Sequence, residues 1–166
     1  MENIIINLFN WLLNKVFGGY MALSQPSLFS TSPQDHLHFF NENAFVDGEK
    51  VVKFLKYKKE DVSVATSVPL SSIRYDEKKM PAELRERLTQ WATALNLVAD
   101  YFQDEKKTII WFSMPNPLLG GMSPRDMIRV GRFKKLLNFI QTALEENKRD
   151  NVDEKASEPK NKRKQA

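Results

Sequence analysis

A regular apolar repeat between residues 84 and 102 constrains the fold of this chain more than any other feature. Apolar side chains recur there in steps of four, three, four, three and four residues, which is the spacing of one face of an α-helix. The repeating positions are Leu84, Leu88, Trp91, Leu95, Val98 and Phe102. Pro81 suits a helix start and Glu83 suits the first turn. The repeat predicts one long amphipathic helix.

Three short helices are predicted before it, between residues 47 and 76. Asp47 is a suitable N-cap for the first, the second covers residues 59–66, and the third begins at Val68-Pro69. The inward-facing positions of the first two are Val51, Val52, Leu55, Val62, Val64 and Ala65, with Lys50, Lys53 and Lys56 on an exposed side. The third carries Ser71, Ser72, Ile73, Arg74 and Tyr75. Helices this short are unstable alone, so we expect them to pack together.

The segment after the long helix predicts further short helices joined by an ordered turn. Residues 108–112 fit a strand or a helix by pattern, and a helix is favoured because no partner strand is visible. Prolines and glycines predict a turn over residues 113–121. Ser123, as an N-cap followed by Pro124, starts the next helix. Its expected inward positions are Met127, Ile128 and Val130.

The chain is predicted to end in one more helix and a disordered tail. Gly131 interrupts the preceding helix, and the last one begins at Arg132. Its apolar face consists of Phe133, Leu136, Leu137, Ile140 and Leu144. Apolar residues almost vanish beyond Glu145, which predicts that residues 146–166 form a disordered charged tail.

Residues 1–40 are predicted to form an N-terminal extension. Asparagines spaced by three and four residues place an amide stripe on an otherwise apolar helix over the first twenty residues. The segment is too short and too polar for a membrane span, and it lacks the pattern of a secretory signal. Two interpretations remain: an amphipathic helix that associates with a membrane surface or an oligomer, or an artefact of the assigned start, since Met21 follows and residues 21–35 are typical of a disordered N-terminus.

The composition offers no catalytic, cofactor-binding or metal-binding constellation. The chain has no Cys, which fits a cytoplasmic protein, and only two His. His36 and His38 have no carboxylate or Cys at metal-ligand spacing, so solvated histidines are favoured over a metal site. Gly120-Gly121 is better explained as a tight turn than as a phosphate cradle. The sequence therefore predicts a binding protein rather than an enzyme.

DNA binding is only weakly indicated by the residues themselves. The net charge of +4 is spread along the chain, whereas nucleic-acid binders usually concentrate their basic residues. The module over residues 47–76 fits a helix-turn-helix motif, in which Ser71, Ser72 and Arg74 would contact DNA. A plain three-helix packing unit fits the pattern better, because Ser67 stands where the turn often has glycine.

The C-terminal half resembles a known family. Trp111-Phe112, the run Asn116 to Gly121 with sequence NPLLGG, the run Ser123 to Arg129 with sequence SPRDMIR, and Gly131-Arg132 together resemble the toxin-binding domain of Xre/MbcA/ParS antitoxins. In that family an Xre-like helix-turn-helix precedes the domain, and residues 64–74 stand at its place. The resemblance covers roughly residues 40–145.

This resemblance implies an all-α fold in which a helix-turn-helix module, residues 41–79, joins a connecting helix and toxin-binding domain, residues 80–145. It implies an antitoxin that binds and occludes a RES-domain, NAD-degrading toxin and represses its own operon. The expected toxin contacts are Leu118, Leu119, Met122, Arg125, Arg129 and Arg132. Its partners would be the toxin, operator DNA and a second copy in a homodimer, since such motifs read two half-sites. The alternative is a stand-alone helix-turn-helix regulator without a toxin.

Overall fold

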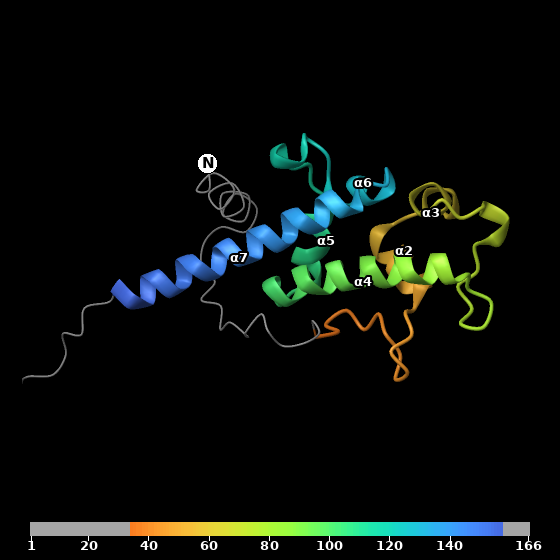
Figure 1. The fold of residues 1–166 in the computed structure, drawn as a ribbon, viewed down its shortest axis with the longest axis horizontal. Helices are drawn as coiled ribbons and strands as arrows, with labels where there is room; N and C mark the ends of the chain where they lie inside the picture. The colour runs from red at the N-terminus through yellow and green to blue at the C-terminus, as the bar shows by residue number, and fades with distance from the viewer. Residues whose placement is uncertain (1–33, 158–166) are drawn as a thin grey trace, which may run out of the picture. The chain divides into compact units, whose positions relative to one another are not determined.

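The computed structural model describes the backbone of residues 34–157 and the side chains of residues 34–147. This part of the chain contains six α-helices, two 3₁₀ turns and no strand, which confirms the all-α prediction (Figure 1). The helices are α2 (Gly48–Leu55), α3 (Lys59–Thr66), α4 (Ala82–Phe102), α5 (Glu105–Ser113), α6 (Pro124–Arg129) and α7 (Phe133–Ser157), and the 3₁₀ turns are η1 (Leu70–Ser72) and η2 (Pro117–Leu119). The described residues belong to two compact units, residues 34–138 and residues 139–157. The amphipathic segment predicted for residues 1–20 lies outside them.

The central element is α4, which contacts α2, α3 and α5. All six positions of its predicted apolar face are buried, so the helix prediction is confirmed. The helix ends at Gln103, whose backbone is left-handed with φ +49° and whose N–H donates to the carbonyl of Ala99 at 2.8 Å. The regular four-and-three spacing produces one continuous buried face, and the other helices pack on it.

The first helix begins after Asp47 and the second covers residues 59–66, both as predicted, but one inward position is wrong. Asp47 caps α2 by accepting a hydrogen bond from the Lys50 N–H at 3.0 Å, and Val62 of α3 is fully buried. Val64, predicted to face inward, is 71% exposed. Two residues correspond to about 200° around an α-helix, so Val62 and Val64 lie on opposite faces.

The third predicted helix does not form. The three-residue turn η1 is the only helical element between α3 and α4, so the prediction of a helix that begins at Val68-Pro69 and continues through Tyr75 is wrong. Ile73 has an extended backbone with φ −69° and ψ 114°, and its side chain is 1% exposed. Burial of this apolar side chain ends the turn, because a continued helix would carry it elsewhere.

The C-terminal helices follow the predicted order. Residues 108–112 lie in α5 and are helical as favoured, and Ser123 caps α6 as predicted, accepting from the Asp126 N–H at 3.2 Å. Met127 and Ile128 are buried, whereas Val130 is 47% exposed, against the prediction. Val130 is the C-cap residue of α6, where the chain turns away from the core.

The last helix, α7, extends well beyond the predicted boundary. It continues to Ser157, so the prediction of a disordered tail from residue 146 is wrong as far as residue 157. That prediction rested on the loss of apolar residues after Glu145. Glu, Lys and Arg are nonetheless strong intrinsic helix formers, and they are frequent in this stretch. The stretch after Glu145 is therefore helical although it has no apolar face.

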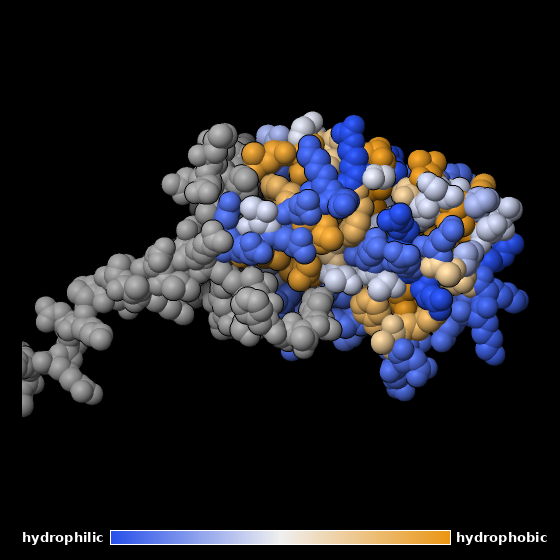
Figure 2. Space-filling model, in the orientation of Figure 1, coloured by the Kyte–Doolittle hydropathy of each residue, from blue (hydrophilic) through white to orange (hydrophobic). Residues whose placement is uncertain are grey.

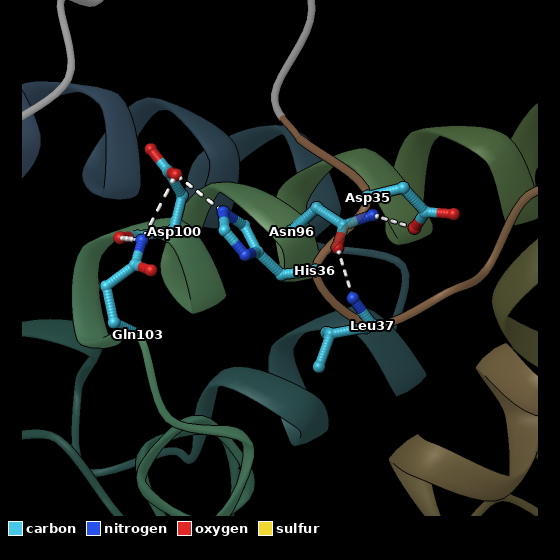
Figure 3. Close-up of polar contacts among 6 residues, drawn as sticks. All are labelled: Asp35, His36, Leu37, Asn96, Asp100 and Gln103. Carbon is cyan, nitrogen blue, oxygen red and sulfur yellow. Dashed lines mark hydrogen bonds and ion pairs between the residues drawn. The ribbon is translucent and has the colours of Figure 1, made fainter.

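The compact unit also begins earlier than predicted, because residues 35–37 are hydrogen-bonded to α4 instead of belonging to an extension (Figure 3). The Asn96 side chain, 1% exposed, binds this segment twice. Its Oδ1 accepts from the Leu37 N–H at 3.1 Å, and its Nδ2 donates to Asp35 at 2.9 Å. The Asp35 carboxylate also accepts from the backbone N–H groups of Phe39 and Phe40, both at 2.9 Å.

The segment is fixed at two further points. His36 Nε2 lies 2.7 Å from Asp100 Oδ1, so His36 is partly buried in a specific contact rather than solvated as predicted. His38 is exposed, as expected. Phe39 is 2% exposed and packs edge-to-face against Phe54, with ring centroids 5.5 Å apart. These contacts make residues 35–40 an integral part of the helical unit.

Removal of the Asn96 amide tests this attachment. We expect Asn96→Ala to lower the free energy of unfolding by about 1–3 kcal/mol, because buried donors and acceptors of the segment lose their partner. Denaturant unfolding measures the change. Thr93→Ala is the control, since the Thr93 hydroxyl bonds only the Thr89 carbonyl within α4 at 2.9 Å. Equal stability of the two variants would contradict the attachment.

Candidate protein-binding surface

A tight turn between α5 and α6 is held in shape by Asn116, which is 4% exposed. Its Oδ1 accepts from the Leu118 N–H at 2.9 Å. Its backbone N–H donates to the Met122 carbonyl at 3.0 Å, and its carbonyl accepts from the N–H of Gly121 at 3.0 Å. The turn is therefore closed by hydrogen bonds from one buried side chain and its own backbone.

Two glycines allow the chain to follow this path. Gly120 and Gly121 have φ angles of +72° and +78°, a left-handed conformation that costs other residues free energy. A Cβ added to either would meet no atom within 4 Å, so backbone conformation, rather than close packing, requires glycine here. The sequence prediction of an ordered turn is confirmed.

The side chains predicted to contact a toxin divide into two groups. Leu119 is 3% exposed and belongs to the core, so we do not include it among the side chains that a partner could contact. Leu118, Met122 and Arg125 are partly exposed, and Arg129 and Arg132 are exposed. The turn and α6 thus present most of the predicted residues to solvent.

Val130 joins these residues as an exposed apolar side chain that sequence reasoning placed inside. It follows α6 directly, and the chain reverses at Gly131, whose N–H donates to the Ile128 carbonyl at 3.0 Å. Gly131, with φ +74°, marks the end of the helix in the sequence, but it gives no sign of which side of the helix Val130 faces.

We call this set the glycine-turn surface. It consists of Leu118, Met122, Arg125, Arg129, Val130 and Arg132. Two contacts order its basic side chains: Arg129 Nη2 lies 3.0 Å from Asp126 Oδ1, and Arg132 Nη1 lies 3.7 Å from Met122 Sδ. Figure 2 shows apolar and hydrophilic atoms side by side over η2 and α6. The surface combines apolar contact area with guanidinium donors.

Tyr57, in the loop between α2 and α3, lies beneath this surface. Its hydroxyl donates a hydrogen bond to the backbone carbonyl of Arg125 in α6, and its ring packs edge-to-face on Trp91 with centroids 6.0 Å apart. Burial raises the pKa of the Tyr57 hydroxyl far above its ordinary value, and the Asp126 carboxylate adds to the rise. Sequence reasoning missed Tyr57, because nothing in local spacing reveals a contact across 68 positions.

The raised pKa of Tyr57 predicts a loss of stability at alkaline pH. Below about pH 10 both the folded and the unfolded chain keep this proton. Above that pH the unfolded chain loses it and the folded chain does not, so the free energy of unfolding falls by up to about 1.4 kcal/mol per pH unit. In Tyr57→Phe this contribution is absent, and the fall should be shallower by that amount. Urea unfolding from about pH 8 to 11 measures it; parallel curves for the two proteins would contradict it.

The residues predicted to contact DNA are exposed but do not lie on a helix. Ser71 and Ser72 belong to η1, and Arg74 follows it with Nη1 donating to the Ile73 carbonyl at 2.8 Å. A three-residue 3₁₀ turn rises only about 6 Å, much less than a recognition helix in a major groove. These side chains are therefore exposed enough to contact DNA, but they do not lie on the recognition helix that a helix-turn-helix motif requires.

Residues 34–147 contain no group of three or more His, Asp or Glu side chains placed to hold a metal ion. Within the described part of the chain, no helix is long and apolar enough to cross a membrane. A scan against protein-family models finds no match to this chain, and a search of curated proteins finds none either.

Proposed function

We propose that this chain is an antitoxin of the Xre/MbcA/ParS type, which binds a RES-domain, NAD-degrading toxin through the glycine-turn surface and occludes its active site. The observation that carries the proposal is a set of exposed and partly exposed side chains, Val130, Met122 and three arginines, on α6 and the two turns that flank it, the first of which is closed by Asn116. The residues that resemble the family's toxin-binding domain are those that build this turn and α6.

The composition of the surface suits a protein partner. Exposed apolar side chains such as Val130 supply the contact area that drives association, and arginine is enriched in interface cores and hot spots. Guanidinium groups also pair in a bidentate manner with carboxylates and phosphates. Such groups occur where an enzyme holds a dinucleotide or its acidic catalytic side chains, so Arg125, Arg129 and Arg132 fit an occluding role.

The rigidity of the surface supports the same function. A loop that is already ordered loses little conformational entropy when it binds. The hydrogen bonds of Asn116, the left-handed glycines and the Ser123 cap of α6 all exist in the unbound chain. The partner therefore meets a preformed shape.

Co-expression with the product of the adjacent gene tests the proposal. That product alone should arrest growth and deplete cellular NAD, and co-expression of this chain should restore both. A product that is harmless alone, or that stays toxic in the presence of this chain, would contradict the antitoxin function.

Repression of the chain's own operon, by a homodimer in the cytoplasm, is the second activity in this proposal. The exposed side chains of Ser71, Ser72 and Arg74 are the residues we assign to DNA. Because they extend from a turn, we expect phosphate contacts rather than base readout. Fluorescence anisotropy with DNA from upstream of the gene should show affinity that falls steeply with salt and weakens in Arg74→Ala.

The anisotropy and co-expression measurements together separate this proposal from a stand-alone regulator. A regulator without a toxin requires specific DNA binding and no effect on the adjacent gene's product. Toxin neutralisation with weak or absent DNA binding would support the antitoxin function and contradict the repressor function.

A further inference from the structure

We infer that Tyr57 is a positioning residue for the glycine-turn surface: its hydroxyl holds the Arg125 carbonyl, and so the N-terminal helices set the position of α6. The geometric part of the inference rests on the hydrogen bond from the Tyr57 hydroxyl to the Arg125 carbonyl. The expected effect on toxin binding rests on the proposed function.

The helix that Tyr57 holds cannot fix its own position. α6 has six residues, fewer than two helical turns, and isolated helices of this length are unstable. It nevertheless carries Arg125 and Arg129 and leads directly to Val130. The placement of half of the glycine-turn surface therefore depends on what α6 packs against, and α3 and α5 are its main neighbours.

Tyr57 is itself held from both sides. Its N–H donates to the Val52 carbonyl at 3.0 Å, which ties it to the end of α2. The next residue, Lys58, caps α3, with its N–H bound by the Asp61 carboxylate at 2.9 Å. The Tyr57 ring rests on Trp91 of α4, with the two rings nearly perpendicular at 86°.

The Tyr57 hydroxyl therefore connects the loop between α2 and α3 to the backbone of α6. The hydroxyl is protonated at neutral pH like any tyrosine, and burial, which raises its pKa, keeps it able to donate further into the alkaline range. The charged groups around it are Asp126, Arg129 and Arg125 of α6 and Asp61 of α3. Removing only the hydroxyl leaves the ring in place and releases the Arg125 carbonyl.

Tyr57→Phe in the full chain tests the inference by two readouts. The first is amide hydrogen exchange over residues 125–130, which should become faster because α6 loses one of its few anchors. The second is inhibition of NAD hydrolysis by the adjacent gene's toxin, which should weaken by about tenfold, as expected for one buried hydrogen bond.

Two controls separate positioning from general destabilisation. Tyr75→Phe removes a hydroxyl from a partly buried tyrosine that lies against Gly48, and it should change neither readout. Val51→Ala truncates a fully buried side chain of α2, so it should lower stability at least as much as Tyr57→Phe while inhibition stays within about twofold of the unmodified chain.

Unchanged exchange over α6 in Tyr57→Phe would overturn the inference. So would faster exchange with unchanged inhibition, or an equal loss of inhibition in Val51→Ala. Failure of the unmodified chain to inhibit the toxin would overturn the proposed function instead, and hydrogen exchange would still decide whether Tyr57 positions α6.

Discussion

If the chain is the antitoxin proposed above, a variant carrying both Val130→Asp and Arg132→Glu is expected to inhibit the RES-domain toxin about a thousandfold less well than the unmodified chain. Val130 is 47% exposed, so in the complex an aspartate there would bury a charge without a partner, and the glutamate would reverse the charge of a contact arginine. Each change of this kind costs about 2 kcal/mol or more at the centre of an interface. Titration of the variant into a NAD-hydrolysis assay measures the loss.

The variant should remain folded, because neither side chain belongs to the core. Its matched control combines Val64→Asp with Lys53→Glu, which makes the same two kinds of change at exposed positions of α3 and α2. We expect both variants to keep their unfolding midpoints, and only the first to lose inhibition. Equal inhibition by the two variants would show that the glycine-turn surface does not contact the toxin.

Trp91→Ala is expected to have the largest effect on stability, a loss of about 3–5 kcal/mol. Trp91 is 1% exposed and lies in α4, the helix that contacts α2, α3 and α5. Its truncation opens a large cavity and removes the aromatic support of Tyr57. Since small domains are stable by only about 5–15 kcal/mol, much of this protein's stability would be lost. Urea unfolding with an intrinsic tyrosine signal or circular dichroism measures the change.

Two further variants serve as controls for the effect of Trp91→Ala on stability. Trp91→Phe keeps most of the ring volume and should lose less stability than Trp91→Ala. Arg87→Ala, at an exposed position of the same helix, should stay within about 0.5 kcal/mol of the unmodified chain. A loss below about 1 kcal/mol in Trp91→Ala would contradict the central position assigned to this residue.

The sequence predicted those parts of the fold that depend on local rules. The six apolar positions of α4 repeat with helical spacing, and Asp47 and Ser123 are N-caps with their expected backbone donors. The glycines at 120 and 121 mark the turn because few other residues accept a left-handed backbone. Each of these signals lies within a few residues of the structure it specifies.

Some errors arose where distant parts of the chain decide the outcome, whereas the extent of α7 was missed because local helix propensity was given too little weight. Asp35 and His36 are fixed by Asn96 and Asp100 of α4, and a polar segment that precedes any helix gives no local sign of such partners. Ile73 leaves a helical path because the core accepts its side chain. Beyond Glu145 the rule that helices need an apolar face failed, since α7 continues to Ser157.

The candidate surface was predicted in part for the same reason. Exposed arginines on α6 and in the following turn could be read from the sequence, because charge and helix start are local properties. The burial of Leu119 and the exposure of Val130 depend on how the turn meets the core. Tyr57 was missed because its role is a contact with a carbonyl, and every residue presents a carbonyl.

Hydrogen exchange of the full chain, with and without the adjacent gene's toxin, tests the central claim most directly. We expect protection over residues 116–132 when the toxin is bound, with the Ser71–Arg74 segment unchanged. Protection confined to other segments, or none at all while the toxin is inhibited, would contradict the assignment of the glycine-turn surface as the toxin-binding site.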